Sequence, residues 1–193
     1  MTDWSNMNWL NPPAHTSIDD EGVLQATSAE TTDFWQVTHY GFQNDNGHAL
    51  LRTATGEFSA GLSFDGNYQT LYDQAGMLLR VDAHHWVKFG VELTDEMTHL
   101  SVVVTRNAQS DWSAQPIALS GPVRLRATRI GDAIILQKQE GEYSWSMIRL
   151  LPDVADGGPV QVGPYLCSPQ RAGFEARFDE FELTRPQMRE LHS

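Results

Sequence analysis

The chain of 193 residues is short of several features that would assign it to a class of protein. It has one cysteine, Cys167, so it can form no internal disulfide bond, which fits a reducing compartment. Its purely apolar runs, such as 133–136, are far shorter than the roughly 20 residues of a membrane-spanning helix. The start, MTDWSNMNWLNPP, has neither the basic residue nor the apolar run of a secretory signal. We therefore expect a cytoplasmic protein.

Positive charge is also scarce. Thirteen Lys and Arg residues stand against 25 Asp and Glu residues, which gives a net charge of −12. Such a field repels phosphate backbones and anionic lipid surfaces, so nucleic acid and membranes are not expected partners. The sequence also lacks a dinucleotide-binding loop, a P-loop, heptads, internal repeats and a Gly-x-Ser-x-Gly nucleophile motif.

What the sequence does contain is alternation with a period of two, clearest in the segments 76–81, 86–93 and 100–105. This period is typical of β-strands with one face in a core. In the middle segment one apolar face carries Val87, Phe89, Val91 and Leu93. The opposite, mixed face carries Trp86, Lys88, Gly90 and Glu92.

Short strands with turn signals between them continue along the chain, and no segment has a helical period. Gly131-Asp132 predicts a two-residue hairpin turn, and residues 82–85 predict a tight link between two strands. The pattern predicts an all-β fold, an antiparallel two-sheet sandwich of the jelly-roll type. We expect a single domain over residues 1–184 and a polar, partly helical C-terminal tail over residues 185–193.

The longer strings of the sequence resemble a known family. YDQAGMLLRVDAHHWVKFGVEL, LSVVVTRNAQSDWS, VGPYLCSP, GFEARFDEFEL and, upstream, TDFWQVTHYGFQNDNGH are similar to the domain-of-unknown-function family of the "regulation of enolase" protein type. The likeness runs from about Trp9 to Leu183. It implies a concanavalin-A-like lectin/glucanase jelly roll, and it supplies no catalytic residue.

The segment 29–48 has no regular period and is rich in aromatic side chains with Asn, Asp and His between them. A loop of about 20 residues inside a compact domain is usually functional. Its rings suit stacking on sugars, and its polar groups suit hydroxyls. The alternative is that Phe34, Trp35 and Phe42 close one end of the core while the polar residues meet water.

We therefore predict a non-catalytic, regulatory domain that binds a carbohydrate or a sugar-like metabolite on the concave face of the sandwich. An alternative is a glycoside hydrolase using Glu92, although no Glu-x-Asp-x-Glu string accompanies it. A further alternative is a homodimer that associates through a flat sheet face. Lys88 and Glu92 can also simply solvate an outer sheet face, alone or as a pair. The predicted ligand-binding residues are Trp35, His39, Tyr40, His48, Asp73, Gln74, Trp86, Lys88, Glu92 and Trp112.

Metal ligands are weakly represented. The seven histidines form no His-Glu-x-x-His motif and there is no cysteine pair, which argues against zinc. No loop repeats Asp at the spacing of an EF-hand. The likeness to lectin-like domains leaves Asp179, in FDEF, as a weak calcium candidate, and we expect no other cofactor.

Overall fold

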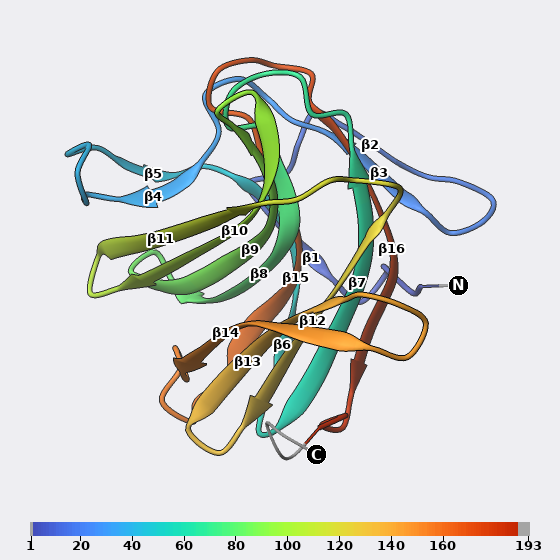
Figure 1. The fold of residues 1–193 in the computed structure, drawn as a ribbon, viewed down its shortest axis with the longest axis vertical. Helices are drawn as coiled ribbons and strands as arrows, with labels where there is room; N and C mark the ends of the chain where they lie inside the picture. Colours follow the sequence, from blue (N-terminus) through green and yellow to red (C-terminus); the bar gives the residue numbers. More distant parts are fainter. Residues whose placement is uncertain (1, 189–193) are drawn as a thin grey trace.

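In the computed structural model, which describes residues 2–188, every regular element is a β-strand (Figure 1). Two seven-stranded antiparallel sheets pack face to face, which confirms the all-β jelly-roll sandwich. Sheet 1 has the order β1 (Asn8–Leu10), β6 (His48–Ala54), β15 (Val160–Cys167), β8 (Gln74–Asp82), β9 (His85–Thr94), β10 (Met97–Arg106) and β11 (Gln109–Pro116). Sheet 2 has the order β14 (Trp145–Pro152), β13 (Ala133–Gln139), β12 (Val123–Ile130), β7 (Phe58–Gly66), β16 (Glu175–Thr184), β3 (Leu24–Thr27) and β2 (His15–Ile18). Between residues 2 and 188, no helix has the length and apolar character needed to cross a membrane.

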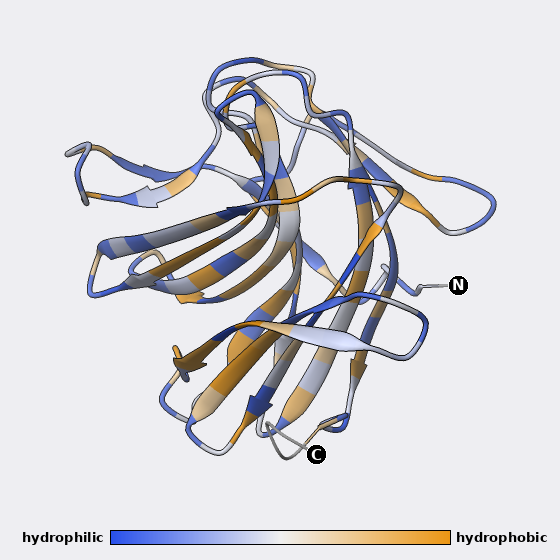
Figure 2. Ribbon diagram, viewed as in Figure 1, coloured by the Kyte–Doolittle hydropathy of each residue, from blue (hydrophilic) through white to orange (hydrophobic). Residues whose placement is uncertain are grey.

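The main core lies between the two sheets, where alternate side chains of each strand meet. Val87, Phe89 and Val91 of β9 are fully buried there, as the alternation predicts. Figure 2 shows the same alternation as apolar and polar bands along the strands. Burial of a side chain of this size contributes about 1.5–3 kcal/mol, so these strands provide much of the fold's stability.

The hairpins that join the strands follow the turn signals. β8 ends at Asp82 and β9 begins at His85, so the link between them is as short as predicted. The β12–β13 turn consists of Gly131 and Asp132, and Gly131 has a φ of 56°, which a glycine adopts without steric cost.

The segment 29–48 departs from the prediction of an irregular loop. It contains a two-stranded antiparallel sheet, β4 (Phe34–Gln36) and β5 (Gln43–Asp45), which we call the β4–β5 ribbon. Figure 1 shows this ribbon projecting beside sheet 1 on the side away from sheet 2. The sequence shows no clear period here because each of the two strands has only three residues.

Side chains, rather than shared strand pairing, fasten the ribbon to sheet 1. The guanidinium of Arg80 donates two hydrogen bonds to the carboxylate of Asp45, at 2.7 and 2.8 Å. Phe34 is fully buried in a second apolar cluster with Trp35, Leu78, Trp86 and neighbouring side chains of sheet 1. The ribbon therefore covers part of the outer face of sheet 1 and encloses the polar side chains there.

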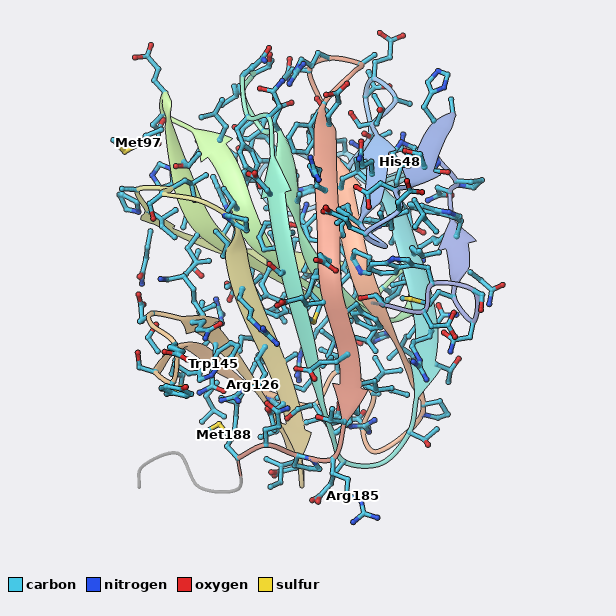
Figure 3. All side chains as sticks on the ribbon, turned by 90° about the vertical axis from the view of Figure 1, so that its right-hand side faces the viewer. His48, Met97, Arg126, Trp145, Arg185 and Met188 are labelled. Atoms are coloured by element: carbon cyan, nitrogen blue, oxygen red, sulfur yellow. The ribbon has the colours of Figure 1, made fainter. Side chains whose placement is uncertain are left out.

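The C-terminal strand is followed by a short segment that lies across the end of sheet 2, at β7 and β12. The prediction of a partly helical tail over 185–193 fails for residues 185–188, which form no helix, and residues 189–193 lie outside the described residues. The backbone N–H of Gln187 donates to Ser59 Oγ at 2.9 Å, which holds this segment on β7. Nearby on the same sheet, the Arg126 guanidinium lies 4.2 Å from the centre of the Trp145 ring (Figure 3).

Candidate functional site

A cleft of about 290 Å³ lies between the β4–β5 ribbon and the outer face of sheet 1, and we call it the ribbon cleft. Small-molecule sites commonly have volumes of about 300–1,000 Å³, so its size suits a ligand of one or two rings. β8, β9, β10 and β11 form its floor and one wall, and the ribbon forms the opposite wall. The lining residues are Asp33, Trp35, Tyr40, Phe42, Asn44, Tyr72, Gln74, Lys88, Glu92, Val103, Trp112, Pro169 and Gln170.

Aromatic rings form the walls near the opening. Tyr40 and Phe42 stack on each other with centroids 5.4 Å apart, and Trp35 meets Tyr40 edge-on at 5.6 Å. Tyr40 and Phe42 remain 46% and 44% exposed, and Trp112 on β11 remains 36% exposed. Tyr72, just before β8, forms a hydrogen bond with Tyr40, and this bond connects the ribbon to sheet 1. The same bond is the main cause that raises the pKa of Tyr72 to about 12. Large apolar faces are therefore open to a ligand.

A buried ion pair lies deeper in the cleft. Lys88 Nζ on β9 is 2.9 Å from Oδ1 of Asp33, the residue that precedes β4. Burial opposes the ammonium, yet the pKa of Lys88 is raised because the Asp33 carboxylate favours the charged form. Asp33 Oδ1 also accepts from the backbone N–H of Phe34 at 2.8 Å. Lys88 therefore pairs with the ribbon rather than with Glu92, the pairing that the sequence left open.

Glu92 is the carboxyl group of the cleft that has no ion-pair partner. It is 6% exposed, and its Oε2 atom has no hydrogen-bond partner within residues 2–188. Burial raises the pKa of Glu92, although Lys88, Ser101 and Trp112 act in the opposite direction. A buried carboxyl group with an unsatisfied oxygen costs stability, and such groups are concentrated at functional sites.

Six of the ten ligand-binding residues predicted from the sequence line this cleft. Their convergence arises because Gln74 and Glu92 face each other across β8 and β9, while Trp112 is opposite Val103 on β10. These six are Trp35, Tyr40, Gln74, Lys88, Glu92 and Trp112.

Three of the other four are buried in contacts with the rest of the chain and lie outside the cleft lining. Trp86 is fully buried in the cluster beneath the ribbon, and its Nε1 donates to the Ala83 carbonyl at 3.2 Å. His48 is buried, with Nε2 accepting from the Ala29 N–H at 3.1 Å. The alternation placed Trp86 on the mixed face correctly, but the ribbon covers that end of the face.

Asp73 is the third, and it is fully buried beside the loop after β15. It accepts from Ser168 Oγ at 2.7 Å and pairs with Arg171 Nη2 at 2.7 Å. Burial opposes its charge, but these bonds lower the pKa of Asp73. His39, the fourth, is exposed at the ribbon tip, where its ring lies 4.8 Å from that of Tyr40, outside the cleft lining.

Seven lining residues were missed from the sequence. Asp33, Phe42 and Asn44 lie within the aromatic segment 29–48, so their neighbourhood was identified even though their roles were not. Val103 belongs to the alternation of β10, on the mixed face, where its apolar side chain gave no sign of a ligand-binding role. No signal in the sequence places Tyr72, Pro169 and Gln170 at the cleft, since all three come from connections between strands.

Metal binding finds no support in the geometry. Across residues 2–188, no three His, Cys, Asp or Glu side chains gather closely enough to hold an ion. The calcium candidate Asp179 uses Oδ1 to accept from the backbone N–H of Glu180 at 2.6 Å, within a bulge of β16.

Comparison with known proteins identifies relatives over almost the whole chain. A family model described as "Protein of unknown function (DUF1349)" matches residues 9–186. "Regulation of enolase protein 1" of Saccharomyces cerevisiae is 37% identical over 194 residues, which cover 99% of this chain and 96% of the yeast protein.

Solved structures share the fold. A crystal structure of a functionally unknown protein from Saccharomyces cerevisiae has a TM-score of 0.89 and 36% identity, and the match covers 97% of this chain and 100% of that one. A GH43 protein from Bacillus licheniformis, BlXynB, matches with a TM-score of 0.72 and 19% identity. That match covers 93% of this chain and 37% of the Bacillus chain, and at this identity it shows the fold alone.

Proposed function

The chain belongs to the DUF1349 family of proteins of unknown function, and we propose that it binds a carbohydrate, without converting it, in the ribbon cleft. The observation that carries the proposal is the composition of this cleft. Exposed aromatic faces stand near its opening, and buried polar groups lie at its base. A jelly-roll fold that also occurs within a glycoside hydrolase agrees with a sugar ligand as a fold-level analogy.

The arrangement suits a pyranose because such a ring has an apolar C–H face and a polar rim. Trp112 and the stacked pair of Tyr40 and Phe42 offer surfaces for the C–H face. Asn44 offers an amide donor and acceptor for hydroxyl groups. Gln74 offers its amide oxygen as an acceptor, because its Nε2 already donates to Asp33 Oδ1 and to the Tyr72 carbonyl. The proposed ligand thus contacts aromatic and amide side chains that come from both the ribbon and sheet 1.

Binding without catalysis is favoured because the cleft has only one free carboxyl group. Hydrolysis of a glycoside uses two carboxyl groups across the scissile bond. The cleft is lined by two acids, Asp33 and Glu92, and Asp33 is already paired with Lys88. A glycosidase remains the second candidate, because burial that raises the pKa of Glu92 also suits a general acid. Turnover of aryl glycosides that is lost in Glu92→Gln would favour the second candidate.

The test is a thermal-shift and calorimetric titration of the protein with glucose, xylose and their short oligosaccharides. A ligand of the folded state at 100 times its Kd stabilises that state by about 2.7 kcal/mol. Tyr40→Ala and Trp112→Ala should each weaken binding about fivefold or more, because each removes an open aromatic face. Tyr143→Ala is the matched control, since Tyr143 is 86% exposed and lies outside the cleft lining.

Two results would contradict the proposal. One is the absence of any thermal shift or heat of binding across the sugar panel at millimolar concentration. The other is binding that Tyr143→Ala weakens as much as Trp112→Ala does, since this would locate the sugar away from the ribbon cleft.

A further inference from the structure

We infer that the ribbon cleft selects sugars by charge, through Glu92: it accepts neutral sugars, favours those with a protonated amine and excludes phosphorylated or acidic ones. The inference rests on the proposed function, because it names the class of sugar that the same cleft takes. It follows from the charges of the lining residues, from the enclosure of Glu92 and from the chemistry of the walls.

The charge of the cleft is unbalanced. Its lining contains two acidic side chains, Asp33 and Glu92, and one basic side chain, Lys88. The single cation among them, Lys88, is committed to Asp33 at 2.9 Å, and its side chain is only 4% exposed. With Asp33 and Lys88 compensating each other, ionised Glu92 gives the cleft one uncompensated negative charge.

Enclosure makes this charge effective. Glu92 is 6% exposed, so little water screens it, and interactions between charges are stronger in such surroundings than at the surface. Its Oε2 atom is buried and accepts no hydrogen bond from residues 2–188, so no donor in this part of the chain neutralises the carboxylate at that oxygen. A ligand that brings positive charge into the cleft therefore stabilises the ionised form of Glu92.

The other side chains of the cleft lining also favour a cationic ligand over an anionic one. Aromatic faces attract cations through their negative quadrupole, and the rings of Trp35, Tyr40 and Trp112 line the cleft. A phosphate or carboxylate needs Arg or Lys side chains or clustered N–H donors, and the cleft lining offers no arginine and no unpaired lysine. Arg80, the arginine that holds the ribbon, is outside this lining and donates from both terminal nitrogens to Asp45.

Consequently an anionic sugar meets repulsion from Glu92 with no cation to offset it. A neutral sugar is indifferent to the charge and gains only stacking and amide hydrogen bonds. A sugar with a protonated amine gains the same contacts together with attraction to Glu92 and to the rings. Affinity should therefore be highest for sugars with a protonated amine, lower for neutral sugars and lowest for anionic sugars.

The experiment is calorimetric titration at pH 7 and low salt with a matched series: glucose, 6-amino-6-deoxyglucose, glucosamine, glucose 6-phosphate and glucuronic acid. At least one amino sugar should bind about fivefold or more tighter than glucose, and both anions about tenfold or more weaker. Glu92→Gln keeps the size of the side chain and removes its charge, so the spread between amine and phosphate should fall to within about threefold. Glu96→Gln, an exposed position in the β9–β10 turn, should leave the series unchanged.

The outcomes separate the two proposals. If glucose binds and glucose 6-phosphate binds equally well or better, charge selection is wrong while sugar binding stands. If the order holds but Glu92→Gln leaves it unchanged, Glu92 is not its cause and the inference also fails. If no member of the series binds, the proposed sugar site fails for glucose-type ligands and the inference fails with it.

Discussion

Replacing Lys88 by Met tests the buried ion pair that connects the ribbon to sheet 1. The substitution leaves an unbranched apolar side chain one atom shorter, and it removes the positive charge together with the ammonium that lies 5.9 Å from the centre of the Trp86 ring. Asp33 is then left in a buried position, its side chain only 12% exposed, without its cation. Breaking a buried pair from one side costs about 3–5 kcal/mol, because the remaining charge stays desolvated and unpaired.

The result is measurable as a shift in Tm. In a chain of this size 1 kcal/mol corresponds to about 2–4 °C, so Lys88→Met should lower Tm by about 6–20 °C in differential scanning calorimetry. The matched control is Arg149→Met, which breaks the Arg149–Asp111 pair. The side chains of Arg149 and Asp111 are 27% and 67% exposed, so the expected loss of folding free energy is below about 1 kcal/mol.

A double variant sharpens the test. Lys88→Met with Asp33→Asn removes both charges, and the amide oxygen of Asn can still accept from the backbone N–H of Phe34. It should therefore recover part of the stability that Lys88→Met loses. The reasoning is refuted if Lys88→Met and Arg149→Met shift Tm equally, or if the double variant is no more stable than Lys88→Met.

Two other predictions concern stability. Gly90→Ala should cost about 3 kcal/mol or more in urea unfolding, because its Cβ would lie 2.1 Å from the carbonyl oxygen of Ala75. Gly56→Ala, with a φ of 66° and open space around it, should cost only about 1 kcal/mol, and equal losses would contradict this account. Glu92→Gln should stabilise the protein by an amount that grows as the pH rises above 4.5. The pKa of Glu92 is raised, so the folded state binds this proton more tightly than the unfolded state does, and the wild type loses stability as pH rises. A Tm difference between this variant and the wild type that is constant from pH 4.5 to 8 would refute it.

The sandwich was predictable because its signal is local. Each long strand carries its own alternation, and the segments 76–81, 86–93 and 100–105 correspond to β8, β9 and β10 with slightly longer limits. The turns at Gly131 and after Asp82 are likewise encoded by a few adjacent residues. Side-chain period fixes which face a residue occupies, and Trp86, Lys88 and Glu92 were all placed correctly in that respect.

The sequence could not show that the ribbon covers the mixed face of β9, because the contacts that hold it there join residues far apart in the chain. Asp33 meets Lys88 across 55 positions of sequence, and Asp45 meets Arg80 across 35. Nothing near Trp86 in the sequence shows that Phe34 will lie on it. Six of the cleft's lining residues were therefore named from the sequence, whereas the other seven and the burial of Trp86, His48 and Asp73 were not.

The ribbon has a consequence for how this architecture can diversify. Its two strands pair only with each other, so the hydrogen-bond ladders of both large sheets are complete without it. Residues 37–42 at its tip can then change in length and chemistry while Phe34 and Asp45 keep the anchorage. The sandwich resembles an antibody framework in this respect, because a constant scaffold presents a short exchangeable loop. Under the proposed function, grafting one tip onto another member of the family should transfer the preference for sugars.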